Sequence, residues 1–280
     1  MRLSVQKTLK MYVGGKFIRS ESGRVLPTKA SDGTPMNAAH ASRKDLRDSV
    51  GNNRKAQGGW AARSAYNRGQ ILYRLAEMLE GRGDSLPTGE SDWQAAVDRA
   101  VHHAGWTDKI TAVLSSLNPV SAAYVNYSMI RPLGVVVAFP HPDDGLLGLV
   151  ETACQILVMG NTGTLVVPIE HAELATAFTE ALHTSDLPGG AINVLTGHVS
   201  ELLPVADTHD DIDSILVVEG AVTADQWATS QHEGAHVLRR LVQVHRAAAP
   251  AGPDVFSKLC EVKTVWMSAM GEIPAGRIAY

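Results

Sequence analysis

The stretch Arg131–Pro140 reads RPLGVVVAFP, and its apolar run from Gly134 to Phe139 predicts a buried β-strand. Further short apolar runs follow at the spacing of βαβ units, and they predict strands at Thr164–Val167, Ala191–Leu195 and Ser214–Val218. Runs that are apolar at every position indicate strands covered on both faces. The sequence therefore predicts an α/β fold with a Rossmann-like, doubly wound parallel sheet.

Helical patterns lie between these strands and before them. In the sheet region, the apolar spacing predicts helices at Leu146–Val158, Glu173–His183 and Val199–Ala206, and a long helix that starts near Thr223. Upstream, helices are predicted after Ser42, at Ala65–Glu80 and from Asp92 to about Ile110. These earlier helices are expected to form an N-terminal helical layer.

The two ends of the chain carry extended patterns. Met11–Ile18 predicts a hairpin that turns at two glycines, and Glu21–His40 is predicted to be a loop. After Pro250 we expect a loop followed by a strand over the apolar run Val262–Met270. The partner of that strand is expected elsewhere in the fold or in another chain.

Composition narrows the class of protein. The chain has 280 residues, a formal net charge of −4 and two cysteines. These values favour a reducing, cytoplasmic location and give no electrostatic attraction to nucleic acid or to an anionic membrane. No apolar window reaches the length of a membrane span. We expect a single domain over 1–280 with a core at 132–248.

Six segments, in order, resemble the aldehyde dehydrogenase superfamily. They are MYVGGKF with SGR (11–24), NRGQILYRLAEML (67–79), RPLGVVVAFP (131–140), GNTGTLVVPIE (160–170), DLPGGAINVLTG (186–197) and HDDIDSILVVEGA (209–221). The resemblance implies a nucleotide-binding domain of that superfamily. It also implies strands near 119–131 and 259–270 of the kind that join subunits in the family.

The resemblance carries few functional residues with it. The family's oxyanion-binding Asn, in P-W-N-F-P, is absent after the first strand, where the chain reads PHPDDG (140–145). The cofactor-binding positions that still match are Pro168 and Glu170 of the family's K-P-S-E phrase and Gly220 of its F-T-G-S turn. Glu219 and Asp225 place carboxylates where family members bind a pyrophosphate, so we expect dinucleotide binding to be weakened.

The family's catalytic phrases do not occur. Neither E-L-G-G-K nor G-Q-x-C is present, and Cys154 and Cys260 lie in apolar-flanked segments that favour structural roles. We therefore expect the catalytic thiolate domain to be absent and predict no catalytic residue. The chain is similar to the shorter, non-catalytic, cysteine-lacking second unit of the superfamily's tandem branch.

Three functional hypotheses follow. The first is a pseudoenzyme that serves as a non-catalytic subunit or scaffold, with a full-length aldehyde dehydrogenase or a second copy of itself as partner. The second is an NAD-dependent aldehyde oxidoreductase with a degenerate site, and weak NAD(P) binding is left open although no cofactor is expected. The third is a zinc hydrolase, because His232 and His236 form an H-E-x-x-H pattern. The pair His102 and His103 is predicted to lie on the surface.

Overall fold

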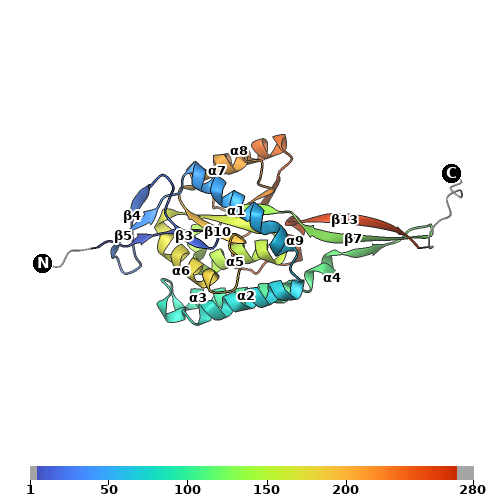
Figure 1. Cartoon of the computed structure of the whole chain (residues 1–280), viewed down its shortest axis with the longest axis horizontal. Coiled ribbons are helices and arrows are strands. Elements are labelled where there is room, and N and C mark those ends of the chain that lie inside the picture. The colour runs from blue at the N-terminus through green and yellow to red at the C-terminus, as the bar shows by residue number, and fades with distance from the viewer. Residues whose placement is uncertain (1–4, 270–280) are drawn as a thin grey trace.

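The central sheet has the strand order β12-β11-β8-β9-β10-β2-β3 in the computed structural model, which describes residues 5–269 (Figure 1). Its parallel strands are β8 (Val135–Phe139), β9 (Thr162–Val167), β10 (Ile192–Thr196), β11 (Ser214–Val218) and β12 (Arg240–Val244). The predicted hairpin, β2 (Met11–Val13) and β3 (Lys16–Ile18), extends the sheet beyond β10 in antiparallel pairing. The doubly wound fold is confirmed.

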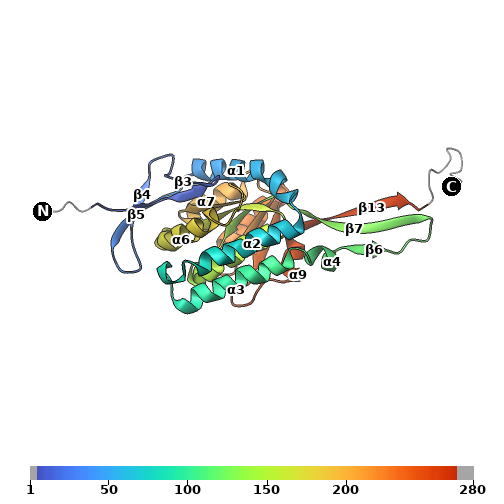
Figure 2. The ribbon, with the colours of Figure 1, turned by 60° about the horizontal axis from the view of Figure 1, so that its bottom comes forward.

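Helices cover both faces of this sheet (Figure 2). One face carries α1 (Arg43–Ala61), α7 (Val199–Asp207) and α8 (Ala224–His236), and the other carries α5 (Gly145–Val158) and α6 (Ala172–His183). The helices α2 (Ala65–Glu80) and α3 (Glu90–Trp106) pack outside α5 and α6 as a further layer. The N-terminal helices are therefore divided between the two sides of the sheet.

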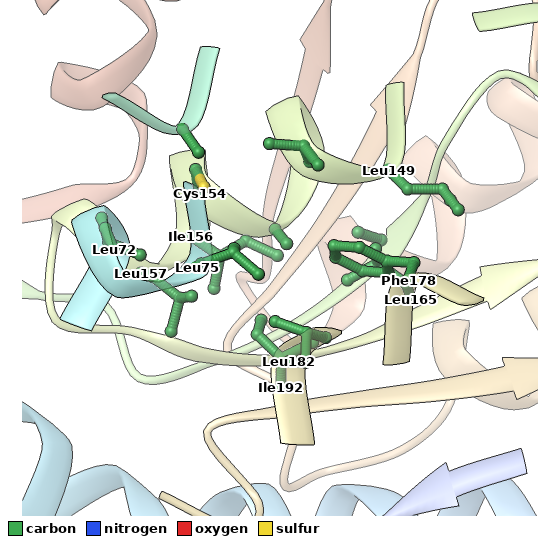
Figure 3. Close-up of a cluster of buried hydrophobic side chains, with 14 of the residues drawn as sticks. Leu72, Leu75, Leu149, Cys154, Ile156, Leu157, Leu165, Phe178, Leu182 and Ile192 are labelled. Carbon is green, nitrogen blue, oxygen red and sulfur yellow. The ribbon is translucent and has the colours of Figure 1, made fainter. Parts of the chain in front are cut away.

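The core follows from the alternation of side chains along β8. Val136 and Ala138 join the apolar cluster under α5, whereas Val135, Val137 and Phe139 join the cluster under α1 and α7. Figure 3 shows the cluster under α5, where side chains from α2, α5, α6, β9 and β10 meet. A strand packed on both faces must be apolar at every position, which is why the sequence pattern predicted these strands correctly.

A long antiparallel pair projects from the amino ends of the parallel strands and is called the arm below (Figure 1). It consists of β7 (Tyr124–Pro132) and β13 (Cys260–Ser268), paired from Cys260 with Pro132 to Ser268 with Tyr124, and β6 (Ser116–Asn118) lies on the other edge of β7. A short helix, α4 (Ile110–Leu114), precedes it. The predicted tail strand thus has its partner within the same chain. Met270, its last predicted residue, lies outside the described residues.

The prediction of a loop over Glu21–His40 is wrong. This segment contains β4 (Val25–Lys29) and β5 (Pro35–Ala39), which form a small sheet with β1 (Thr8–Leu9). The side chains of β4 alternate between half-buried and exposed, and each strand includes a proline, so the segment lacks a strong apolar signal. The short helix α9 (Pro253–Lys258) was likewise predicted as loop, and β12 was not predicted.

Three single-turn 3₁₀ helices complete the described elements: η1 (Gly83–Ser85), η2 (Pro142–Asp144) and η3 (Ile169–His171). Within residues 5–269, no helix is long and apolar enough to cross a membrane.

Candidate functional site

The carboxyl ends of β8, β9 and β11 meet at the point where the strand order reverses. From β8 the chain adds β9 and β10 on one side, then crosses back to add β11 and β12 on the other. Open α/β sheets bind ligands in the crevice outside such a switch point. We call this place the crevice, and the predicted residues Pro168, Glu170 and Gly220 follow β9 and β11 at its rim.

His141 occupies the crevice beside Gly220. The imidazole follows β8, and its Nδ1 accepts a hydrogen bond from the Asp143 backbone amide at 3.1 Å. Its Nε2 and Cδ2 lie 3.1 Å from the position that a Cβ on residue 220 would take, and Gly220 has φ +84°. The ring and the glycine turn are thus in close contact, and this His was not singled out from the sequence.

Pro168 and Glu170 lie at the end of β9, where the chain turns into α6. Pro168 contributes to a cavity that also includes His141 and His171, and its volume is about 10 Å³. A volume of this size is at the lower limit for one water molecule, whereas small-molecule sites measure roughly 300 to 1,000 Å³. Glu170 is exposed on the 3₁₀ turn. The cavity between the residues after β8 and β9 is therefore far smaller than a typical small-molecule site.

The N-terminus of α8, next to Gly220, is capped by its own side chains. The Thr223 hydroxyl accepts from the Gln226 amide at 3.2 Å, and the Gln226 side chain accepts from the Thr223 amide at 2.9 Å. Backbone amides at a helix N-terminus are the donors that would otherwise bind a phosphate. Asp225 adds a negative charge in the first turn. This helix end satisfies two of its own amides and opposes an anionic ligand.

Arg246 and His245, which follow β12 near the crevice, contact carboxylates. Arg246 donates to Asp144 at 2.5 Å, and the His245 ring lies 3.1 Å from a Glu219 carboxylate oxygen. Asp144 also accepts from the Ala247 amide. Because these groups pair with each other, the crevice presents little positive charge to a pyrophosphate.

The two thiols lie away from the crevice. Cys154 is fully buried in α5 among leucine and isoleucine side chains (Figure 3), and burial raises the pKa of its thiol. Cys260 is buried at the start of β13, and burial likewise raises the pKa of this thiol. A nucleophilic cysteine needs a lowered pKa and access to substrate. Both predicted structural cysteines have the surroundings of structural residues.

The H-E-x-x-H pattern lies on α8. The imidazoles of His232 and His236 are neighbours, with ring centroids 4.8 Å apart, and Glu233 contacts the His232 ring at 3.4 Å. Zinc hydrolases hold their metal with three protein ligands. Among the described residues, no group of three His, Cys, Asp or Glu side chains could hold a metal ion.

The prediction that His103 lies on the surface is wrong, because its side chain is fully buried in a polar cluster. Glu151 on α5 accepts from Arg99, from His103 Nε2 at 3.0 Å and from Gln155 at 2.6 Å. It also accepts from the Ala251 amide at 2.9 Å. No local pattern indicates this cluster, because Arg99 and His103 on α3 lie 52 and 48 residues from Glu151 on α5.

The buried cluster has a defined charge state. Burial would raise the pKa of Glu151, but hydrogen bonds from His103, Arg99 and Gln155 outweigh it and lower the pKa to about 2. Burial lowers the pKa of His103. An ionised Glu151 therefore pairs with Arg99 and accepts a hydrogen bond from His103. Arg99 also donates to the Ala247 carbonyl at 3.0 Å, so the cluster fixes the segment between β12 and α9.

The sheet order and the crevice at its switch point define the class of Rossmann-like α/β proteins, in which dinucleotides bind at this edge. A profile of the aldehyde dehydrogenase family matches residues 17–239. The chain belongs to the aldehyde dehydrogenase family.

Individual relatives agree with this assignment. DhaS of Bacillus subtilis, whose name places it among aldehyde dehydrogenases, is 29% identical over 229 residues, which are 75% of this chain and 46% of DhaS. Mouse retinal dehydrogenase 2 is 27% identical over 75% of this chain and 43% of its own length. The chain thus spans about half the length of these relatives.

Solved structures share the fold. The NAD⁺ complex of an aldehyde dehydrogenase from Bacillus cereus superposes with a TM-score of 0.77 and 21% identity, over 85% of this chain and 51% of that chain. The HpcC protein from Thermus thermophilus gives the same TM-score at 20% identity. In this chain, His141, the small cavity beside Pro168 and the carboxylate-paired Arg246 lie at the carboxyl ends of the strands, the edge at which Rossmann-like folds bind dinucleotides.

Proposed function

We propose that this chain is a non-catalytic member of the aldehyde dehydrogenase family that acts as a subunit or scaffold of an aldehyde dehydrogenase assembly. The observation that carries the proposal is the close contact of the His141 ring with the Gly220 turn at the carboxyl ends of β8 and β11, the edge at which Rossmann-like folds bind a dinucleotide. Two further observations support the proposal: carboxylates pair with Arg246 and His245 beside the crevice, and both cysteines of the described residues are buried. Binding of NAD(P) is expected to be absent or weak.

The arm supports the choice of an assembly role. Its strands expose large apolar side chains, with Val262 and Trp266 each 61% exposed. Exposed apolar residues on a projecting pair of strands favour burial against another subunit. The partner we propose is a full-length aldehyde dehydrogenase subunit or a second copy of this chain.

The experiment that tests the assembly role is purification of the tagged protein from its native cells, with mass determination of the assembly. A full-length aldehyde dehydrogenase in fixed ratio supports a heteromeric scaffold, and a defined homo-oligomer supports self-association. A monomer without partner overturns the assembly role.

A second measurement tests the non-catalytic role. We expect isothermal titration with NAD⁺ to give no heat from the isolated protein, and we expect no NAD⁺-dependent oxidation of simple aldehydes. Saturable NAD⁺ binding together with turnover would establish an active oxidoreductase instead. Stoichiometric zinc that is lost in His236→Ala would support the hydrolase hypothesis.

A further inference from the structure

A second, polar cleft lies at the opposite edge of the sheet from the crevice, where the arm joins the body. It is bounded by the C-terminal ends of α1 and α5, by α2 and α4, and by the connection from β7 to β8. Its volume is about 610 Å³, within the range of small-molecule sites. We call it the arginine cleft, because Arg54, Arg68 and Arg131 line it from three different elements.

The cleft concentrates positive charge in a protein whose net charge is −4. No carboxylate is among the described residues that line it. Within residues 5–269, Arg54 pairs with an acid, Asp213, at 2.8 Å, whereas Arg68 and Arg131 form no ion pair. The positive charge is therefore local to the cleft, because the chain as a whole carries a net negative charge.

Arg68 is half-buried and incompletely satisfied. One nitrogen, Nη1, donates to the Arg63 carbonyl at 2.7 Å, whereas Nε is buried and has no hydrogen-bond partner within residues 5–269. Burial lowers the pKa of this guanidinium, and no acid offsets the effect. A buried donor without an acceptor costs roughly 1 to 3 kcal/mol, so the protein itself does not fully satisfy the Arg68 guanidinium.

Arg131 is exposed on β7 and lacks an ion-pair partner among the described residues. Its cross-strand neighbour on β13, Glu261, is engaged by Arg240 at 2.8 Å. The guanidinium of Arg131 is thus available to a ligand.

We propose that the arginine cleft binds a phosphorylated small molecule, with its phosphate held by Arg68 and Arg131. Guanidinium groups bind oxyanions through paired N–H donors, and they do so more strongly than neutral donors do. Phosphate is tetrahedral, so its oxygens can accept hydrogen bonds from several directions. Donors on separate elements therefore fit a phosphate better than they fit a planar carboxylate. The remaining volume, beside Gln57 and Thr111, accommodates the organic part of the ligand. This site is separate from the crevice, so it stands whether or not the proposed function holds.

The test is isothermal titration of the full chain with inorganic phosphate, pyrophosphate and citrate at low ionic strength. We expect one equivalent of pyrophosphate to bind, and inorganic phosphate to bind more weakly. Arg131→Gln should weaken pyrophosphate binding at least about tenfold, because it removes one charge-assisted contact. Citrate that binds as tightly as pyrophosphate overturns the preference for phosphate.

Two further variants separate a built site from general charge attraction. Arg68→Lys keeps the charge but loses the planar pair of donors, so we expect weaker binding with an unchanged melting temperature. Arg47→Gln removes the same charge from an exposed position of α1 outside the cleft and should leave binding unchanged. The proposal fails if the wild-type chain shows no saturable binding, or if Arg47→Gln weakens binding as much as Arg131→Gln does.

Discussion

Cys154 illustrates how residue-level surroundings decide chemistry in this chain. Its thiol is fully buried, and burial raises its pKa, so almost no thiolate forms at neutral pH. We predict that Ellman's reagent will not modify Cys154 in the native protein and will modify it fully after denaturation. Lys55→Cys, which places a thiol on the exposed face of α1, provides the reactive control. Rapid native modification of Cys154, located by peptide mass spectrometry, would contradict the assignment of a structural role.

Ionisation of Glu151 makes the free energy of unfolding depend on pH. Its folded-state pKa of about 2 lies below the ordinary value of 4.5, so its stabilising effect is present above about pH 4.5 and is lost as the pH falls towards 2. We predict that Glu151→Gln lowers the free energy of unfolding by about 3 kcal/mol at pH 7, because it leaves the buried Arg99 without its counter-ion. Urea unfolding followed by circular dichroism measures this difference.

Repeating the urea unfolding at a series of pH values tests whether ionisation of Glu151 causes this difference in stability. The gap between wild type and Glu151→Gln should narrow as the pH falls below 4.5, and a gap that stays constant to pH 3 would show that ionisation of Glu151 is irrelevant. Glu77→Gln removes a carboxylate from an exposed pair with Arg74 and should have no measurable effect.

At the scale of single residues, the sequence predicted the environment of a side chain correctly where that environment is set by residues nearby in the chain. The thiols were predicted to be structural from their apolar flanks, and both are buried. His103 and His141 were not recognised, because their environments depend on Glu151 and on Gly220, which lie 48 and 79 residues away. Contacts of that range leave no local pattern.

At the scale of elements, the buried side-chain amide of Asn53 helps to fix α1 to the sheet. Asn53 donates to the carbonyls of Gly163 and Gly190 at 2.9 and 2.8 Å, and it accepts from the Thr164 hydroxyl at 2.6 Å. We predict that Asn53→Ala destabilises the fold by about 3 kcal/mol, because it leaves buried polar groups without partners.

Chemical denaturation checks this prediction against a neighbouring residue. Asn52 lies at the surface of the same helix and donates to the Asp48 carbonyl within its own turn, so Asn52→Ala should change stability by less than about 0.5 kcal/mol. Equal effects of the two substitutions would mean that the bonds of Asn53 to β9 and to the turn before β10 contribute little.

The elements that the sequence predicted correctly are those with a single, strong physical cause. The strand β8 must be apolar throughout because helices cover both its faces, and Ser42 begins α1 through a capping box with Asp45. By contrast, β4 is an edge strand with exposed side chains at alternate positions, and it contains Pro27. Its pairing with β5, and not its own composition, makes it a strand.

For the molecule as a whole, the arm and the body have different physical requirements. The body buries apolar clusters on both faces of its sheet, whereas the arm is a thin sheet whose side chains remain largely exposed. An isolated strand pair is marginally stable in water, so an arm of this length gains from burial against a partner. The sequence predicted the strand near 262–270 but left its partner open, because strand pairing between distant segments has no local signal.

Trp266 on β13 is the residue at which assembly can be tested. Its side chain is 61% exposed and lies next to Tyr124, with ring centroids 6.2 Å apart. We predict that Trp266→Glu disrupts the proposed assembly by placing a charge in an apolar interface, and that it leaves the melting temperature of the isolated chain nearly unchanged. Size-exclusion chromatography with light scattering reports the mass.

The matched control is Lys263→Gln, an exposed polar position on the alternate face of the same strand, which should keep the assembly intact. An unchanged mass for Trp266→Glu would mean that any partner binds elsewhere, because a contact over this part of the arm cannot accommodate a buried, unpaired carboxylate.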